Sequence, residues 1–391
     1  MKNSQGCNVA IISSLTGGLG HYCAHLADPL SKLCDIKFIT YPQVDLTGTV
    51  TKQITDSFVK RHIKWPRFDI DESNSQSILT IRNYIVSHNI KVVNVHIGTT
   101  VKRKITYFTT LFNYLRYMND VKIIFTLHDV MPFDEDKKVM NLLEMFYSLA
   151  DHFNVGNTLE KSKLMKTFHI PEKNIDVIPH GIYDLFNKNI YTQATARNFL
   201  GIPEDVNVFL FFGFLREYKG FKYLIRASKL LQKKHDNFIV YVATGLRYAS
   251  ESLIEKSMNE ITKLGLDSKF YQNFNYLDTH DIEAVFKASD AVVLPYTHAS
   301  QSGVLMMSAS FKKPVVITEA FYDKVWIRKK AGLVADTKDP TSLAEKMSIL
   351  MTDKELSNKM GQYCYDYAST HFRWDQIAQK YFDMYQKVLK K

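Results

Sequence analysis

Short runs of apolar, β-branched residues alternate with amphipathic stretches along almost the whole chain. This pattern predicts parallel β-strands connected by helices, because a strand buried on both faces reads as a continuous apolar run. The expected strands of a first series are 9–13, 36–41, 91–95, 121–127, 153–155 and 176–178. Those of a second series are 206–212, 238–242, 269–271, 291–294, 315–317 and 333–334. Helical patterns fill the gaps and continue from Asp339 to the end, so the sequence predicts an α/β protein.

A stretch rich in turn residues, 178–205, separates the two series. It contains two prolines and two glycines around one short helical pattern, and such residues mark loops and boundaries. Because 391 residues exceed the usual size of one hydrophobic core, we predict two Rossmann-like, doubly wound domains, 1–185 and 186–371. If the two domains face each other, the carboxyl ends of both sheets border a central cleft.

Composition argues against several classes of protein. Hydrophobic residues make up 46% of the chain, yet no apolar run is long enough to span a bilayer, and the N-terminal apolar segment is too short for a secretory signal. The cysteines lack metal-site spacing, and we expect buried free thiols in a reducing cytoplasm at Cys7, Cys23, Cys34 and Cys364. The net charge of +10 suits nucleic acid, an anionic membrane or an anionic small ligand. Nucleic acid fits least well, because the basic residues are spread over both halves and no nucleic-acid motif is present.

Residues 288–316 are the most informative segment for function. Their pattern predicts a buried strand, a Pro-Tyr turn, a loop of small polar residues and a helix that opens at Ser302, Gly303 and Val304. The first backbone amides of a helix have no intrahelical partner, and the helix dipole adds about half a positive charge there. Such a helix start at the carboxyl end of a strand can bind a phosphate.

A second turn offers two cations. Arg216 and Lys219 follow the expected strand 206–212 and precede a helix that opens at Gly220. Basic side chains are usually solvated surface residues, but this pair would face Gly303 if the two strands share a sheet. A planar guanidinium and a compact ammonium together suit a diphosphate. In a closed site they would stabilise negative charge that develops on a leaving group.

The first half of the chain contributes two further features at strand ends. The turn after the first strand contains Gly17 and Gly18, which would let backbone amides approach an anion or would simply form a tight turn. His96 and His128 end two expected strands, where a histidine is more often structural than functional. His128 is the stronger candidate, because Asp129 follows it and a neutral imidazole there could hydrogen-bond a sugar hydroxyl.

Residues 101–122 predict an amphipathic helix with a basic end. The apolar stripe that would pack on the sheet is Val101, Ile105, Phe108, Phe112 and Leu115. A second, partly aromatic edge is Tyr107, Leu111 and Tyr114. Lys102, Arg103 and Lys104 crowd the expected helix start, where the dipole disfavours cations. They either form a solvated basic face or contact the headgroups of an anionic membrane.

With these features in place, the chain resembles the GT-B-fold glycosyltransferases of the large retaining family four over nearly its whole length. The resemblance rests on the order and spacing of several motifs. They are the Gly17-Gly18 turn, the strand end 126–129, the exit 178–181, Arg216 with Lys219 and Gly220, the strand 288–296, the loop 301–304, the segment 313–316 and the C-terminal segments 332–347 and 372–381. In this family the last helix crosses back, so residues 372–391 are expected to belong to the first domain.

The resemblance implies retaining transfer of a sugar from a UDP- or GDP-linked donor to a hydroxyl of a glycan or lipid-linked acceptor, in the synthesis of a cell-surface polysaccharide or glycolipid. Arg216 and Lys219 would hold the diphosphate, and His128 would touch the donor sugar. The other residues implied in donor binding are Gly17, Gly18, Gln301, Ser302, Gly303 and Val304. The departing diphosphate would deprotonate the acceptor, so the reaction needs no protein nucleophile, metal or cofactor. The expected location is the cytoplasm, with possible contact to the inner face of the membrane.

The sequence departs from the family at its paired glutamates, which would fall at Ala299 and Met307. Methionine cannot accept hydrogen bonds from a ribose diol, so either residues 300–302 take over contacts or donor binding is weakened. We expect the former, because Arg216, Lys219 and His128 are all retained.

Two alternatives follow: a pseudo-transferase that acts as a binding subunit, and a sugar-nucleotide epimerase, which would need further carboxylates. The triplet 69–71 resembles a metal-binding D-x-D, but it lies among charged residues before a helix and is expected to be solvated surface.

Overall fold

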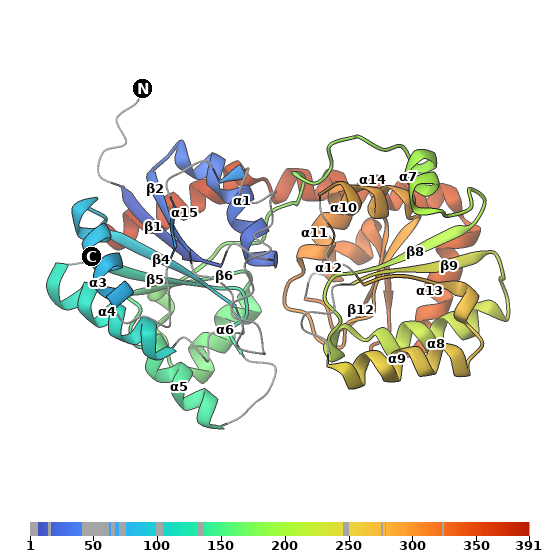
Figure 1. Ribbon diagram of the computed structural model, residues 1–391, viewed down its shortest axis with the longest axis horizontal. Helices are drawn as coiled ribbons and strands as arrows, with labels where there is room; N and C mark the ends of the chain where they lie inside the picture. The colour runs from blue at the N-terminus through green and yellow to red at the C-terminus, as the bar shows by residue number, and fades with distance from the viewer. Residues whose placement is uncertain are drawn as a thin grey trace. The chain divides into compact units, whose positions relative to one another are not determined.

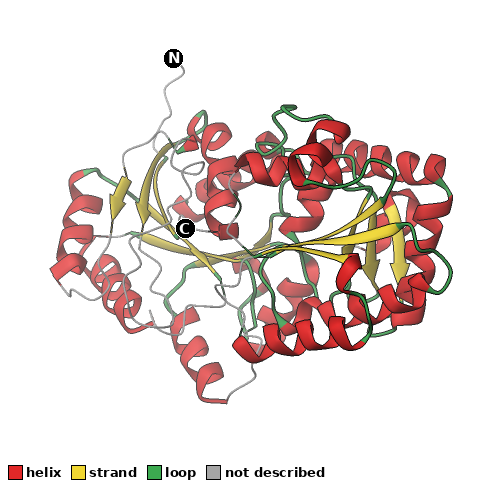
Figure 2. Ribbon diagram, turned by 45° about the vertical axis from the view of Figure 1, so that its right-hand side comes forward, coloured by secondary structure: helices red, strands yellow, loops and turns green. Residues whose placement is uncertain are grey.

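The computed structural model describes residues 7–14, 17–40, 62–63, 67–69, 76–98, 105–119, 121–131, 137–244, 250–274, 277, 279–322 and 324–390. The chain divides into two compact units. The first unit consists of Met1–Gly181 with Trp374–Lys391, and the second unit consists of Ile182–Arg373. Within each unit, helices cover both faces of a central sheet (Figures 1 and 2).

The first unit is built on a sheet of seven described strands in the order β3-β2-β1-β4-β5-β6-β7, all parallel. The strands are β1 (Asn8–Ser13), β2 (Asp35–Thr40), β3 (Arg67–Asp69), β4 (Val92–Ile97), β5 (Lys122–Leu127), β6 (His152–Val155) and β7 (Ile175–Val177). β3 is a short edge strand that the sequence pattern missed, because three residues with one apolar position give no periodic signal. Asp69 therefore ends a strand rather than lying in a loop, and residues 70 and 71 lie outside the described ranges.

The helices of the first unit are α1 (Gly17–Ser31), α3 (Gln76–Ser87), α4 (Ile105–Asn119), α5 (Lys137–Tyr147), α6 (Thr158–Thr167) and α15 (Trp374–Leu389), with the short helix η2 (Glu172–Asn174). A core of apolar side chains lies between the sheet and α3, α4 and α5. The predicted stripe of α4 is buried there from Ile105 to Leu115, and each buried phenylalanine stabilises the fold by about 1.5–3 kcal/mol. Leu111, expected on the aromatic edge, is also fully buried, because α3 and α5 flank α4 and widen its buried face.

The C-terminal helix α15 packs on α1 within the first unit, as the sequence resemblance predicted. Its buried residues recur at helical spacing from Trp374 to Val388 and form one apolar stripe. Two tyrosine hydroxyls on this stripe are hydrogen-bonded. Tyr381 contacts the hydroxyl of Tyr22 at 3.0 Å and accepts from Asn154 at 2.9 Å, and Tyr385 accepts from Asn94 at 2.8 Å. Gly181 fits against Trp374 only because it lacks a side chain: a Cβ there would lie 2.3 Å from the indole ring.

The second unit repeats the architecture with six described parallel strands in the order β10-β9-β8-β11-β12-β13. The strands are β8 (Asn207–Phe212), β9 (Phe238–Ala243), β10 (Phe270–Asn273), β11 (Ala291–Leu294), β12 (Val315–Thr318) and β13 (Gly332–Ala335). The helices are α7 (Gln193–Leu200), η3 (Glu217–Lys219), α8 (Phe221–Gln232), α9 (Glu251–Lys263), η5 (Asp267–Lys269), α10 (Thr279–Ala288), α11 (Gly303–Ser310), α12 (Lys324–Trp326), η6 (Ile327–Ala331), α13 (Pro340–Thr352) and α14 (Lys354–His371). The predicted class, two doubly wound α/β domains with a C-terminal helix on the first, is confirmed.

Candidate functional site

Each sheet has one point where the strand order reverses direction, between β1 and β4 in the first unit and between β8 and β11 in the second. At such a switch point the connections leave toward opposite faces of the sheet, so the carboxyl ends of the two strands border a crevice where ligands bind. The described residues that the sequence singled out for donor binding lie near these two places. Each place is described within its own unit.

In the second unit, Gly213 directly follows β8 and brings two elements together. Its backbone has φ +97°, which L side chains rarely adopt. A Cβ at Gly213 would lie 2.5 Å from Nζ of Lys219 and 3.6 Å from Cγ2 of Val304. Because β8 and β11 are adjacent in the sheet, the ammonium of Lys219 and the first turn of α11 border the same glycine.

The two loops that carry these groups are fixed against each other. The backbone N–H and the hydroxyl of Thr297 both donate to the carbonyl of Tyr218, at 2.7 and 3.2 Å. Gly220 has φ +69°, and a Cβ there would lie 1.9 Å from the carbonyl oxygen of Pro295. Only glycine permits this close backbone approach, so the position of Lys219 relative to α11 is determined by the sequence of both loops.

Lys219 is a buried cation without an opposite charge among the described residues. Its side chain is 7% exposed, and Nζ donates to the carbonyl of Phe212 at 3.3 Å and lies 5.5 Å from the ring of Tyr296. Burial, together with the positive charge of Arg216, lowers the pKa of Lys219 to about 7. An anion placed beside this ammonium would relieve both the desolvation and the repulsion.

The first turn of α11 adds backbone donors to this place. Ser302 is the N-cap, and its hydroxyl accepts from the amide of Leu305 at 3.3 Å. The amides of Gly303 and Val304 belong to the first turn, where the helix has no carbonyl to offer them. The sequence placed Ser302 in donor binding and missed its capping role, which leaves its O–H as the group that can still donate.

The two positions where the family has glutamates are apolar and buried in this unit. Ala299 forms a β-bridge with Phe321, and its amide donates to the carbonyl of Ala320 at 3.3 Å. Met307 is a residue of α11, and its side chain is buried as well. Of the neighbouring polar residues, Ser300 is buried and Gln301 is partly buried. The structure thus keeps the loop folded without either carboxylate.

In the first unit, α1 begins at Gly17, which has φ +59°, and a Cβ at Gly18 would meet no atom within 4 Å. His128 directly follows β5, and its amide donates to the carbonyl of Ile97 at the end of β4 at 2.9 Å. The Nδ1 atom of His96 lies 3.2 Å from Nε2 of His128. The structure therefore brings together the two histidines that the sequence considered separately.

An aromatic cluster that sequence reasoning missed surrounds these histidines. The ring of Tyr22 lies 4.8 Å from that of His128, 5.5 Å from His96, 5.1 Å from His180 and 4.9 Å from Trp374. His180 was visible in the sequence as part of a strand-end motif, but nothing pointed to Tyr22, which lies inside α1. Burial lowers the pKa of His96 to about 3 and that of His180 to about 4. Burial and the neighbouring His96 and His180 hold the pKa of His128 well below its usual value.

The structure describes only part of the basic, aromatic segment predicted around α4. Lys102, Arg103 and Lys104 lie outside the described residues. On α4 itself, Tyr114 is 43% exposed and Tyr117 is 88% exposed. No helix in the described part of the chain is long and apolar enough to cross a membrane. The described residues also hold no cluster of three or more histidine, cysteine, aspartate or glutamate side chains suited to a metal ion.

Known proteins match this chain along most of its length. Residues 16–184 match the family Glycosyltransferase Family 4, and residues 192–367 match Glycosyl transferases group 1. A glycosyltransferase of Methanocaldococcus jannaschii is 22% identical over 390 residues, covering 95% of this chain and 94% of that protein. D-inositol 3-phosphate glycosyltransferase of Corynebacterium diphtheriae is 24% identical over 247 residues, covering 60% of this chain and 56% of that protein.

A solved structure supports the fold. Anabaena HepE in complex with UDP and glucose aligns with a TM-score of 0.78 at 14% identity, covering 97% of this chain and 100% of that one. The family matches and the doubly wound fold of both units show that this protein belongs to the glycosyl transferases group 1, the retaining GT-B glycosyltransferases of family 4, which use nucleotide-sugar donors.

Proposed function

We propose that this enzyme transfers a hexose from a UDP- or GDP-linked donor to a hydroxyl of a glycan or lipid-linked acceptor, in the synthesis of a cell-surface polysaccharide or glycolipid. The observation that carries the donor half of the proposal is the buried ammonium of Lys219, which borders Gly213 and the start of α11 and has no carboxylate partner among the described residues. A diphosphate supplies the missing negative charge.

The proposed chemistry assigns one task to each group. Lys219, Arg216 and the amides of α11 bind the diphosphate and stabilise the charge that it gains as the bond from the anomeric carbon to the phosphate oxygen breaks. The acceptor oxygen forms the new bond on the same face, and its proton passes to a phosphate oxygen of the departing diphosphate. His128, neutral near pH 7 because its pKa is low, hydrogen-bonds the donor sugar without adding a positive charge.

UDP is the first nucleotide to test, because the solved relative HepE binds UDP and glucose. The apolar Met307 removes the carboxylate that in the family binds the ribose, so we expect the diphosphate to contribute most of the affinity. Calorimetry with UDP, GDP and dTDP measures which of these nucleotides the protein binds. Incubation with the corresponding nucleotide sugars, followed by nucleotide release and by NMR of the product anomer, then tests transfer and retention.

The outcomes separate the candidates. Binding of one nucleotide with release that depends on an added glycan or lipid acceptor supports the proposal. Release or isomerisation without any acceptor points to epimerase chemistry, and the absence of binding by all three nucleotides contradicts donor binding at Lys219.

For the acceptor half, we propose contact with an anionic membrane through the start of α4. Tyr114 and Tyr117 are exposed toward the end of this helix, with the exposed Arg116 between them, and exposed tyrosines beside a basic residue suit the headgroup region. The test is sedimentation with phosphatidylglycerol liposomes of a variant carrying Glu at Lys102, Arg103 and Lys104. Its control has the same change of charge at three exposed lysines of the second unit, Lys233, Lys234 and Lys256. Weaker binding of the first variant alone supports the proposal, and equal binding of both variants contradicts it.

A further inference from the structure

His96 and His128 form a hydrogen-bonded pair of imidazoles at the ends of adjacent strands. β4 and β5 are paired in register, with His96 opposite Thr126 and Ile97 opposite Leu127. The amide of His128 donates to the carbonyl of Ile97, which continues the ladder by one step past β5. This backbone bond brings the ring of His128 over the end of β4, where Nδ1 of His96 lies 3.2 Å from Nε2 of His128.

Both rings are neutral near pH 7, because burial lowers the pKa of each. A hydrogen bond between two neutral imidazoles needs one donor and one acceptor, so only two arrangements of the protons exist. Either His96 donates from Nδ1 and His128 carries its proton on Nδ1, or His128 donates from Nε2 and His96 carries its proton on Nε2.

The surroundings of His96 distinguish these arrangements. Its side chain is 0% exposed, and Nε2 has no hydrogen-bond partner among the described residues. In the second arrangement, this buried Nε2 would carry an N–H that donates to nothing. In the first, it would carry only an unused lone pair, and buried groups lacking an acceptor are rarer in proteins than buried acceptors lacking a donor. The first arrangement is therefore favoured.

We propose that His96 is a positioning residue, whose Nδ1–H donates to Nε2 of His128 and thereby keeps the proton of His128 on Nδ1. This rests on the proposed function, in which the ring of His128 contacts the donor sugar: with Nε2 accepting from His96, the ring is held in one tautomer and one orientation. A neutral ring in that state meets a hydroxyl or an ether oxygen of the sugar without adding a charge. Tyr22, in contact with both rings, limits the rotation of the pair.

The first experiment reads the tautomer without any activity. The protein is labelled with ¹⁵N-histidine, the resonances of His128 are assigned with a His128→Asn variant, and long-range ¹H–¹⁵N couplings show which nitrogen carries the proton. We expect Nδ1–H in the wild type. In His96→Phe, which preserves the ring volume but removes the donor, we expect His128 to move toward the Nε2–H form. A wild-type His128 protonated on Nε2 would overturn the proposal.

The second experiment is kinetic and includes a conservative variant. His96→Asn places an amide N–H close to where Nδ1 stood, so it should recover most of the activity that His96→Phe loses. We expect a loss in kcat on the order of tenfold or more for His96→Phe, with little change in UDP affinity. The control is a Phe substitution of another fully buried histidine, His152→Phe. His152 begins β6 and pairs with Asp176 of β7. His152→Phe should lower stability and leave the tautomer of His128 unchanged.

The outcomes of the two experiments are distinguishable. Unchanged kcat in a folded His96→Phe variant, or equal losses for His96→Phe and His96→Asn, would contradict the positioning role. If the wild type neither binds nucleotides nor transfers sugar, the proposed function fails, while the NMR measurement still decides the proton arrangement.

Discussion

Lys219 is buried at the carboxyl edge of the second sheet, where its strands end, and Lys313 is partly buried at the amino edge, where they begin. The surroundings of the two lysines differ. At the amino edge, Nζ of Lys313 donates to the carbonyls of Ser289 at 2.6 Å and Lys287 at 3.2 Å. Burial lowers its pKa to about 8, and the neighbouring Asp290 works against that shift. At the carboxyl edge, Lys219 has one carbonyl at 3.3 Å and a neighbouring positive charge on Arg216. The same residue type is satisfied by the protein at one edge and left in need of an anion at the other.

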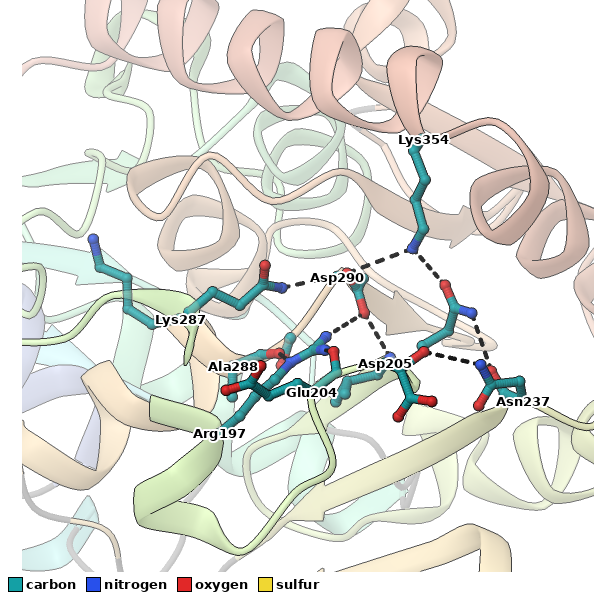
Figure 3. A network of polar contacts seen from close by, with 12 residues as sticks. Arg197, Glu204, Asp205, Asn237, Lys287, Ala288, Asp290 and Lys354 are labelled. Carbon is teal, nitrogen blue, oxygen red and sulfur yellow. Dashed lines mark hydrogen bonds and ion pairs between the residues drawn. The ribbon is translucent and has the colours of Figure 1, made fainter. Parts of the chain in front are cut away.

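The amino edge is a closed polar network around Asp290 (Figure 3). Its carboxylate accepts from the buried Arg197 at 2.8 Å and from the amide of Val208 at 2.7 Å, and it lies 3.5 Å from Nζ of Lys354. Arg197 also donates to the carbonyl of Ala288 at 3.0 Å. The charges of Asp290 and Arg197 are thus paired within the protein, so this edge supports stability. The comparison indicates that the carboxyl edge is built for a ligand, because it buries a cation at a cost that the fold itself does not offset.

The largest expected effect is the loss of nucleotide binding in Lys219→Ala. Removing the ammonium deletes the buried positive charge beside α11, and we expect UDP affinity and turnover to fall by about 10²–10³-fold. The melting temperature should stay level or rise, because a buried cation without an opposite charge is removed. Calorimetry and thermal unfolding measure the two effects separately.

Two matched lysines make this result specific. Lys222 lies one turn further on the surface of α8 and is largely exposed, so Lys222→Ala should leave both properties unchanged. Lys313→Met removes the partly buried ammonium of the amino edge and leaves two carbonyls without a donor, so it should lower the melting temperature without a specific effect on UDP binding. The contrast between the edges is wrong if Lys313→Met weakens binding as much as Lys219→Ala does.

The second prediction concerns the amino edge alone. In Asp290→Ala, the guanidinium of Arg197 remains buried with no carboxylate, and such a broken pair costs about 3 kcal/mol. Urea unfolding should show this loss, while UDP binding by the folded fraction should be unchanged. A double variant, Asp290→Ala with Arg197→Met, should recover part of the loss, because the orphaned charge is gone. If Asp290→Ala leaves the free energy of unfolding unchanged, the network in Figure 3 contributes nothing to stability.

The sequence predicted the architecture well and the state of the site poorly. Regular runs such as 291–294 predicted their strands, because burial on both faces leaves a continuous apolar signal. The same pattern also located Lys219 and Ser302 at the right strand ends. That Lys219 is buried, however, depends on Gly213 and on the carbonyl of Pro295 pressed against Gly220. These contacts join loops that are far apart in the sequence, so no local sequence pattern predicts them.

The histidine pair gives the same lesson in the first unit. Sequence reasoning placed His96 and His128 at two strand ends and preferred His128, but it treated His96 as a separate residue. Their contact depends on the pairing of β4 with β5 and on the turn of one ring toward the other. Leu111 was assigned to the partly aromatic edge of α4, apart from the stripe that packs on the sheet, because helical spacing does not reveal how widely the neighbouring helices cover a face.

The third prediction is a pH dependence of nucleotide binding with a defined sign. The pKa of Lys219 is lowered to about 7 in the free protein, and a bound diphosphate should raise it again. Below pH 7 the ammonium is present and binding is strongest. As the pH rises above 7, binding must first protonate the lysine, so UDP affinity should fall by up to about tenfold per pH unit.

Calorimetry at pH 8 in buffers of different ionisation enthalpy should detect proton uptake. Lys219→Arg, which stays charged, should flatten the profile, and a flat wild-type profile would show that Lys219 is already fully charged.

The smallest expected effect tests the helix start itself. In Ser302→Ala, the amide of Leu305 loses its side-chain acceptor, and the lost N-cap costs about 1 kcal/mol. Because the amides of Gly303 and Val304 are held in place by that cap, we expect UDP affinity to fall by a few fold, measured by calorimetry. Ser308→Ala is the matched control, since its hydroxyl donates to the carbonyl of Val304 inside the same helix and caps nothing. If the two variants weaken UDP binding equally, the helix start contributes through general stability. If only Ser302→Ala does, the anion is held by backbone donors as well as by Lys219, a combination that the amino edge of the same sheet does not offer.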